Sequence, residues 1–201
     1  NNFLNATDNV SMTVTFSESV IVDTSSGSPT LSIVVGSTNR TATFVSGSSS
    51  TQLVFQYTIQ ASESDSDGIS IGANAIALNS GTIKDAAGNN ATLTHSALSD
   101  NSNYKVDTTA PSVSSFTISD SLLTIGETAT VTLVFSEAVI SFSSSADITV
   151  ANGSLSTMTS SDNITWSGTF TPATNTEDAT NTLSLANNSY TDLAGNNGPS
   201  E

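Results

Sequence analysis

The sequence predicts an all-β protein made of two tandem antiparallel β-sandwiches joined by a short linker. Three observations support this prediction. Short segments such as Val10–Phe16 and Ala129–Phe135 alternate apolar with polar residues, which indicates strands with one buried face. Turn-forming residues separate these segments, and no long stretch has a helical period. Similar landmarks recur in both halves of the chain. Short strands at this spacing, about 100 residues per unit, are typical of immunoglobulin-like (Ig-like) sandwiches.

Two landmarks define the repeat. The segment Phe16–Val20 (FSESV) corresponds to Phe135–Val139 (FSEAV), at a shift of 119 positions. Farther along, Asp85–Asn90 (DAAGNN) corresponds to Asp192–Asn197 (DLAGNN), at a shift of 107. The second copy is therefore 12 residues shorter between its landmarks. A shared order of motifs with length changes between them indicates a tandem repeat.

The segment Val106–Pro111 (VDTTAP) separates the two copies. Proline restricts both its own backbone and that of the residue before it, so we expect a stiff joint. The predicted domains are residues 1–106 and 107–201. The alignment places the counterpart of Val113–Ile118 before residue 1 and leaves four residues after Asn197. We therefore expect the first domain to lack its opening strand and the second to lack most of its last strand.

The remaining predicted strands share this composition and alternation. They are Leu31–Val35, Thr41–Val45, Leu53–Ile59, Ile69–Ile71, Thr92–His95, Tyr104–Val106, Val113–Ile118, Asp147–Val150, Leu155–Met158, Ile164–Phe170 and Thr182–Leu185. A helical turn is predicted only for Ala73–Leu78. Trp166 is in phase with Ile164 and Phe170, which favours a place in the core over an exposed glycan-stacking platform.

The composition excludes several classes of function. A formal net charge of −15, from three basic and 18 acidic residues, argues against nucleic-acid binding, which needs a basic face. The chain has no cysteine and no apolar run of membrane-spanning length. Its one histidine, His95, has no evident acid–base partner in the sequence, and no Gly-X-Ser-X-Gly motif precedes a helix. We therefore expect no enzyme.

Several motifs together resemble a known family. The Val-Asp-Thr-Thr-Ala-Pro joint, Phe-Ser-Glu-X-Val and Asp-X-Ala-Gly-Asn resemble the bacterial Ig-like tandem repeats of giant surface adhesins, RTX-like proteins that Gram-negative bacteria export by type I secretion. The resemblance implies an extracellular extender at the bacterial cell surface, with neighbouring repeats as partners and Ca²⁺ stiffening the joints. Ligands on a host or another surface would bind to other regions of the parent protein.

The carboxylates predict a Ca²⁺ site independently of this resemblance. In an Ig-like sandwich, loops after alternate strands gather at one end, so Glu137 and Asp192 should lie beside Asp107, where the chain enters the second domain. The predicted ligands from the first domain are Asp8, Glu63, Asp65 and Asp67. Ca²⁺ binds six to eight oxygens, and alternating acids before a glycine present several. The three basic residues cannot neutralise such a cluster. The alternative is a solvated acidic surface.

The same reasoning predicts half-sites at the outer ends of the two domains. The expected ligands are Glu18, Asp85 and Asn89 in the first domain and Glu127, Glu177 and Asp178 in the second. These sets lack their partners here, so we expect weak binding or none. Glycine and asparagine in the Asp-X-Ala-Gly-Asn loops have a simpler explanation, because both residues suit left-handed turns.

We therefore interpret the chain as a structural extender module of a bacterial adhesin, rigidified by Ca²⁺ at its interdomain joint. Two alternatives remain open. One is a ligand-binding adhesin module for glycan or protein, which the scarcity of clustered exposed aromatics disfavours. The other is a filament subunit completed by strand exchange, for which the missing terminal strands are the sign.

Overall fold

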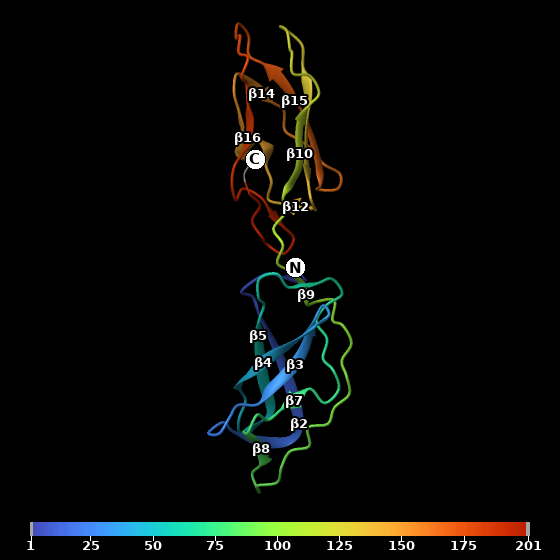
Figure 1. The fold of residues 1–201 in the computed structure, drawn as a ribbon, viewed down its shortest axis with the longest axis vertical. Helices are drawn as coiled ribbons and strands as arrows, with labels where there is room; N and C mark the ends of the chain where they lie inside the picture. The colour runs from blue at the N-terminus through green and yellow to red at the C-terminus, as the bar shows by residue number, and fades with distance from the viewer. Residues whose placement is uncertain (1, 200–201) are drawn as a thin grey trace. The chain divides into compact units, whose positions relative to one another are not determined.

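The computed structural model describes residues 2–199, which form two compact units, Asn1–Thr108 and Thr109–Glu201 (Figure 1). We call these units the first and the second domain. Nearly every element is a β-strand, and apart from one short parallel pair the strands pair antiparallel. This arrangement confirms the predicted all-β fold of tandem Ig-like sandwiches.

The first domain contains two sheets. A six-stranded sheet has the order β7-β3-β4-β5-β2-β8, and a three-stranded sheet has the order β1-β9-β6. The strands are β1 (Phe3–Leu4), β2 (Asn9–Asp23), β3 (Thr30–Val35), β4 (Thr38–Ser46), β5 (Ser50–Thr58), β6 (Ser64–Asp65), β7 (Ile76–Ala77), β8 (Thr82–Asp85) and β9 (Lys105–Asp107). In the smaller sheet β9 lies between its neighbours, parallel to β1 and antiparallel to β6.

Alternating residues of these strands form the core of the first domain. In β3 the side chains of Leu31, Ile33 and Val35 are buried while their neighbours are partly exposed, as the period-2 pattern predicts. Phe55 and Val106 pack in the same cluster, so the small sheet contributes to the core as well.

The second domain has a four-stranded sheet of order β10-β11-β15-β14 and two short pairs, β12-β17 and β13-β16. Its elements are β10 (Val113–Ile118), β11 (Ala129–Phe135), β12 (Val139–Ile140), α1 (Ser144–Asp147), β13 (Ile148–Val150), β14 (Gly153–Leu155), β15 (Thr165–Pro172), β16 (Leu183–Leu185) and β17 (Thr191–Asp192). The strands β10 and β11 have the bounds that the sequence predicts.

Aromatic side chains fill the core of the second domain. Phe135 packs on Phe142 and on the fully buried Tyr190, at ring-centroid distances of 5.6 and 4.6 Å. Trp166 is half-buried and meets Phe142 edge to face at 4.9 Å. The predicted packing of Trp166 against the core is therefore confirmed.

A few predicted elements are wrong. Thr92–His95 is no strand, and Ile69–Ile71 makes only isolated bridges, through Ser70 to Val34 and through Ile71 to Leu98. The segment Ala73–Leu78 forms a turn followed by β7, while a short helix, α1, forms at a place where none was predicted. Segments this short have too few residues for periodicity to distinguish strand from turn, so tertiary contacts decide them.

Candidate metal centre

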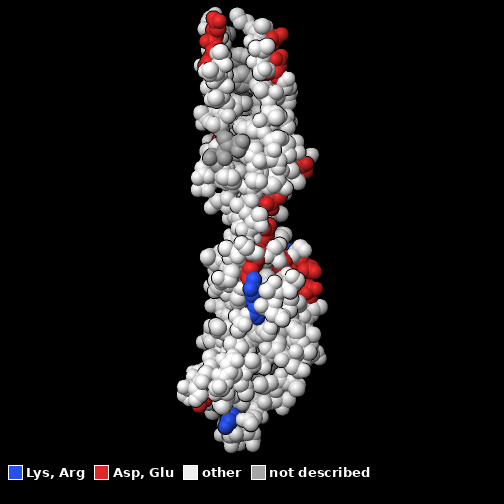
Figure 2. All heavy atoms as spheres, in the orientation of Figure 1, with Lys and Arg blue, Asp and Glu red and all other residues white. Residues whose placement is uncertain are grey.

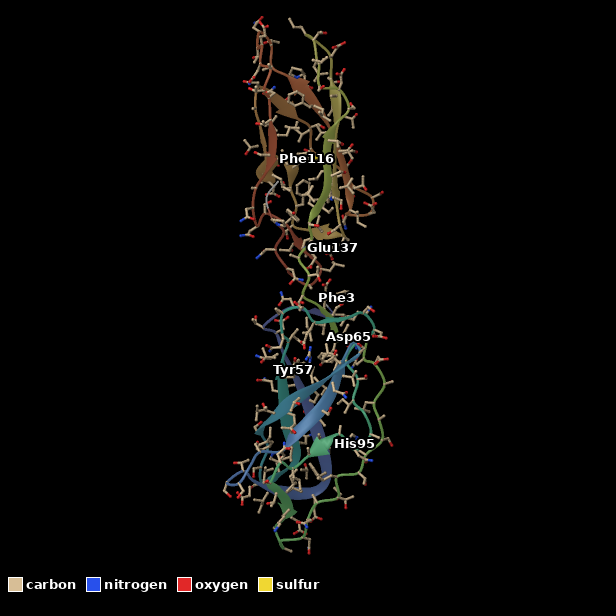
Figure 3. All side chains as sticks on the ribbon, viewed as in Figure 1. Phe3, Tyr57, Asp65, His95, Phe116 and Glu137 are labelled. Carbon is tan, nitrogen blue, oxygen red and sulfur yellow. The ribbon has the colours of Figure 1, made fainter. Side chains whose placement is uncertain are left out.

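Three carboxylates gather at one place. Asp107, Glu137 and Asp192 each offer an oxygen, and these oxygens all lie within 4.8 Å of one another. Asp107 and Glu137 are half-buried, and the side chain of Asp192 is only 1% exposed. We call these residues the carboxylate trio; Figure 3 labels Glu137. All three were predicted as ligands of one ion.

Strand register explains why Glu137 meets Asp192. The long strand β2 pairs with β5 as far as Thr15. After an irregularity Val20 pairs with both β5 and β8, and the rest of β2 pairs with β8. In the second domain the same change of partner separates β11, which pairs with β15, from β12, which pairs with β17. Val139 is the register partner of Asp192. Glu137 comes two residues before Val139, in the segment between β11 and β12 where the pairing partner changes. The Phe-Ser-Glu-X-Val motif therefore places a glutamate beside Asp192.

The loop after Asp192 wraps around its carboxylate. Oδ1 accepts hydrogen bonds from the backbone amides of Gly195 at 2.7 Å and Asn196 at 2.9 Å, and Oδ2 accepts one from the Asn196 side chain at 2.7 Å. Gly195 has φ of +95°, which favours glycine. These neutral donors orient the carboxylate, but they do not cancel its charge.

Asp107 reaches the trio from the end of β9. Its register partner in β6 is Ser64, and the hydroxyl of the next residue, Thr108, donates a hydrogen bond of 2.9 Å to the carbonyl of Glu63. Lys105, two residues earlier, places its ammonium 5.6 Å from the centre of the Phe3 ring.

Two predicted first-domain ligands have other hydrogen-bond partners. Asp65 is 3% exposed and accepts bonds of 2.7 Å from the amides of both Gly36 and Gly68. Glu63 is 4% exposed and pairs with Arg40, while it accepts hydrogen bonds from the Tyr57 hydroxyl at 2.6 Å and the Gln60 amide at 2.8 Å. Both carboxylates therefore stabilise the interior of the first domain. Their role as ligands stays a prediction that this geometry does not favour.

The other predicted ligands lie in turns or on the surface. Asp8 accepts a 2.9 Å bond from the amide of Asn5, and Glu127 accepts one of 2.8 Å from the amide of Thr124. Asp178 accepts bonds from Thr180 and Asn152, which hold the pKa of its carboxyl below the ordinary value. Asp67 and Glu177 are exposed. The metal-ligand role of these five residues stays a prediction.

The first domain contains a partial copy of the trio. Asp85 is held as Asp192 is, by the amide and the side chain of Asn89 at 2.8 and 2.7 Å, and these bonds lower the pKa of its carboxyl. Glu18 corresponds to Glu137 and is exposed. Among residues 2–199 no third acidic residue joins this pair as Asp107 joins Glu137 and Asp192. The Asp-X-Ala-Gly-Asn loop therefore forms without the full trio, which supports its structural explanation as a turn.

The chemistry of the trio fits Ca²⁺. The ligands are oxygens only, and Ca²⁺ prefers carboxylate, carbonyl and water oxygens in flexible arrangements. Three carboxylates supply a formal charge of −3, which a divalent cation would largely offset. Zn²⁺ fits less well, because protein zinc sites use mainly nitrogen and sulfur ligands.

His95 has a structural environment that the sequence did not reveal. Its Nε2 accepts a 2.8 Å hydrogen bond from the amide of Ala75, and its Nδ1 lies 2.8 Å from the carbonyl of Ser96. Because Nε2 accepts and a carbonyl can only accept, the proton belongs on Nδ1. The imidazole thus joins two irregular segments of the first domain.

The comparison with protein families adds one finding. Residues 107–201 match the family described as the bacterial Ig-like domain. The second domain is therefore similar to this family. The match begins at Asp107, so this residue of the trio falls within it. Domains of this type are structural modules that typically occur at the bacterial surface.

No curated protein and no solved structure matches this chain. Within residues 2–199, no helix has the length and apolar character needed to cross a membrane.

Proposed function

We propose that this chain is a structural extender module of a bacterial cell-surface adhesin, and that Ca²⁺ bound by the carboxylate trio stiffens its interdomain joint. The bacterial Ig-like domain at residues 107–201 supports the extender role. The observation that carries the metal proposal is the burial of Asp192 beside two other carboxylates.

Electrostatics supports a cation at this place. Like charges a few ångströms apart lie well inside the Debye length of about 8 Å at physiological salt, so dissolved ions screen them poorly. Burial raises the cost further, since an ionised carboxylate removed from water needs a partner. A divalent cation coordinated by all three carboxylates would offset both the repulsion between them and the cost of burying their charge.

Chain connectivity explains why such an ion would act on the joint. Asp107 ends β9, which backbone pairing with β1 and β6 holds inside the first domain. Glu137 and Asp192 belong to the second domain. An ion that binds all three would restrict rotation about the few bonds of the Thr108–Pro111 linker. A stiff joint lets a series of modules act as a rod rather than a flexible tether.

The test is calcium binding to the 201-residue chain, measured by titration calorimetry and by thermal unfolding in Ca²⁺, Mg²⁺ or EDTA at matched ionic strength. Free Ca²⁺ at 100 times its dissociation constant should stabilise the folded state by about 2.7 kcal/mol. Asp107→Asn and Glu137→Gln keep the shape of each side chain but remove a charge, and each should weaken binding at least about tenfold. Asp100→Asn, at an exposed acid outside the trio, is the matched control and should change nothing.

Three outcomes would contradict the proposal. If Ca²⁺ and Mg²⁺ stabilise the chain equally, the trio is a solvated acidic surface. If Asp107→Asn binds Ca²⁺ as the wild type does, the ion binds elsewhere. If Ca²⁺ binds but small-angle scattering gives the same distribution of interatomic distances in Ca²⁺ and in EDTA, the ion does not stiffen the joint.

A further inference from the structure

Hydrogen bonds anchor the linker on both sides of the point where the two domains divide. On the first-domain side, the hydroxyl of Thr108 donates to the carbonyl of Glu63 at 2.9 Å. On the second-domain side, the side-chain nitrogen of Asn196 donates to the carbonyl of Thr109 at 3.2 Å. The division falls between Thr108 and Thr109, so each bond lies within its own domain. Rotation in the joint is therefore concentrated in the backbone that connects these two threonines.

The rest of the linker is packed on the second domain. Pro111 is buried, and its ring favours an extended backbone at Ala110. The carbonyl of Ser112 accepts the amide of Ser136 at 2.8 Å, and the amide of Ser112 donates to the Ser136 hydroxyl at 2.9 Å. Thr109 and Ala110 are exposed. Burial contributes little to holding these two residues, so the bond from Asn196 gains importance.

Asn196 belongs to the loop that wraps around Asp192. Its backbone amide donates to Oδ1 of Asp192, and its side-chain nitrogen donates to Oδ2 at 2.7 Å. The carboxylate and the Thr109 carbonyl can only accept, so the end of the side-chain amide that faces them is its nitrogen. An NH₂ group carries two protons, one for each of these bonds. Asn196 therefore joins Asp192 to the linker as a donor and not as an oxygen ligand.

This bridge limits how far Asp107 can move from Asp192. Thr109 follows Asp107 by two residues, which span at most about 7 Å. An anchored Thr109 carbonyl therefore keeps Asp107 near the loop that carries Asp192. Figure 2 shows acidic side chains at the end of the second domain where the chain enters it. The carboxylates of the trio repel one another when no cation is bound, and a neutral bridge opposes that repulsion.

The first domain provides an internal comparison. Asn89 has the same place in the first Asp-X-Ala-Gly-Asn loop, where its backbone amide and its side-chain nitrogen donate to Asp85 at 2.8 and 2.7 Å. These two bonds form the loop in both domains. Asn196 makes the equivalent bonds and, in addition, the bond to Thr109. Loop formation does not explain this additional bond.

We propose that Asn196 is a positioning residue of the carboxylate trio, whose side-chain amide clamps the linker to Asp192 and holds Asp107 in place before an ion binds. Ligands that are already in place lose less conformational freedom on binding, so the clamp raises the affinity of the site. The effect on Ca²⁺ affinity rests on the function proposed above, whereas the effect on the linker does not.

The test compares Asn196→Ala with Asn89→Ala in the 201-residue chain. Both variants lose side-chain bonds within an Asp-X-Ala-Gly-Asn loop, so Asn89→Ala controls for the structural cost. Backbone NMR relaxation in EDTA measures the order of the Thr109 and Ala110 amides. We expect order parameters of about 0.85 in the wild type and in Asn89→Ala, and values below about 0.6 in Asn196→Ala.

Calcium titration of the same proteins measures the effect on the site. Asn196→Ala should weaken Ca²⁺ binding at least about fivefold, the factor that corresponds to one lost hydrogen bond. Asn89→Ala should bind Ca²⁺ at the trio as the wild type does. Saturating Ca²⁺ should restore the order of Thr109 and Ala110 in Asn196→Ala, because the ion itself would then hold Asp107.

Each contrary result has its own meaning. Order parameters below about 0.6 at Thr109 and Ala110 of the wild type in EDTA would overturn the clamp without any variant. Weaker Ca²⁺ binding by Asn196→Ala with an ordered linker would show that Asn196 only orients Asp192. Equal Ca²⁺ binding by Asn196→Ala and the wild type would remove Asn196 from the site and leave the proposed function standing. If the wild type binds no Ca²⁺, the proposed function fails, and relaxation in EDTA alone decides this inference.

Discussion

At the scale of single residues, the contacts of Glu63 show how burial changes the role of an acidic side chain. The sequence places Glu63 in an alternating acidic run that resembles a metal-binding loop. In the structure Glu63 pairs with Arg40 and accepts a hydrogen bond of 2.6 Å from the Tyr57 hydroxyl. Burial, and then this hydrogen bond to the Glu63 carboxylate, raises the pKa of Tyr57 to about 12.

This pKa predicts a specific alkaline instability. The unfolded chain loses the Tyr57 proton near the ordinary value of 10.0, whereas the folded chain keeps it up to about pH 12. The contribution of Tyr57 to stability is therefore complete below pH 10 and is lost as the pH rises toward 12. The measurement is urea unfolding of the wild type and of Tyr57→Phe at several pH values. We expect the stability advantage of the wild type to shrink between pH 10 and 12. A constant difference across that range would show that Tyr57 titrates normally.

At the scale of elements, a turn anchors β6 and with it the small sheet. Gly68 donates its amide to Asp65 at 2.7 Å and has φ of +108°. A Cβ atom at this position would lie 2.0 Å from the carbonyl oxygen of Asn101. The backbone at Asn101, in the segment that leads to β9, therefore packs tightly against Gly68. It could not make room for a Cβ atom without shifting that segment.

Gly68→Ala should therefore destabilise the first domain by about 2 kcal/mol or more, from strained backbone and steric overlap together. Thermal and urea unfolding would measure the loss. Gly72→Ala is the control, because Gly72 has ordinary backbone angles and a Cβ there would meet nothing within 4 Å. Equal stability of the two variants would mean that the turn can relax.

At the scale of the whole molecule, net charge is the dominant property. The formal charge of −15 comes from 18 acidic residues with only three basic ones to offset them. Such a charge keeps a protein soluble but opposes its compact state through self-repulsion. Any divalent cation would relieve some of this repulsion without a specific site.

NaCl alone, without any divalent cation, should therefore stabilise the protein. Raising NaCl from about 0.01 M to about 1 M shortens the Debye length from about 30 Å to about 3 Å, and we expect Tm to rise by several degrees. Differential scanning calorimetry at constant pH would measure this shift. A Tm that is independent of salt would show that the acidic residues are too far apart to interact. The same shift explains why the calcium test needs matched ionic strength.

The sequence by itself determined the all-β class and most of the longer strands, because residues such as those of β3 and β11 alternate over at least six positions. It also named Asp107, Glu137 and Asp192 among seven acidic residues expected at one site, and these three lie close together. Glu137 and Asp192 lie in motifs that repeat, and a β-sandwich places alternate loops at one end. Short elements such as β7 and α1 could not be predicted, since two to four residues carry no usable period.

Only the tertiary structure decided which acids are buried. Glu63, Asp65 and Asp67 look alike in sequence, but contacts with Arg40, Gly36 and other distant residues bury the first two and leave the third exposed. A groove in the second domain is lined by residues 120–123 and 176–179, segments more than 50 residues apart, so only the fold reveals it. Sequence patterns report local preference, whereas burial and groove formation depend on long-range contacts.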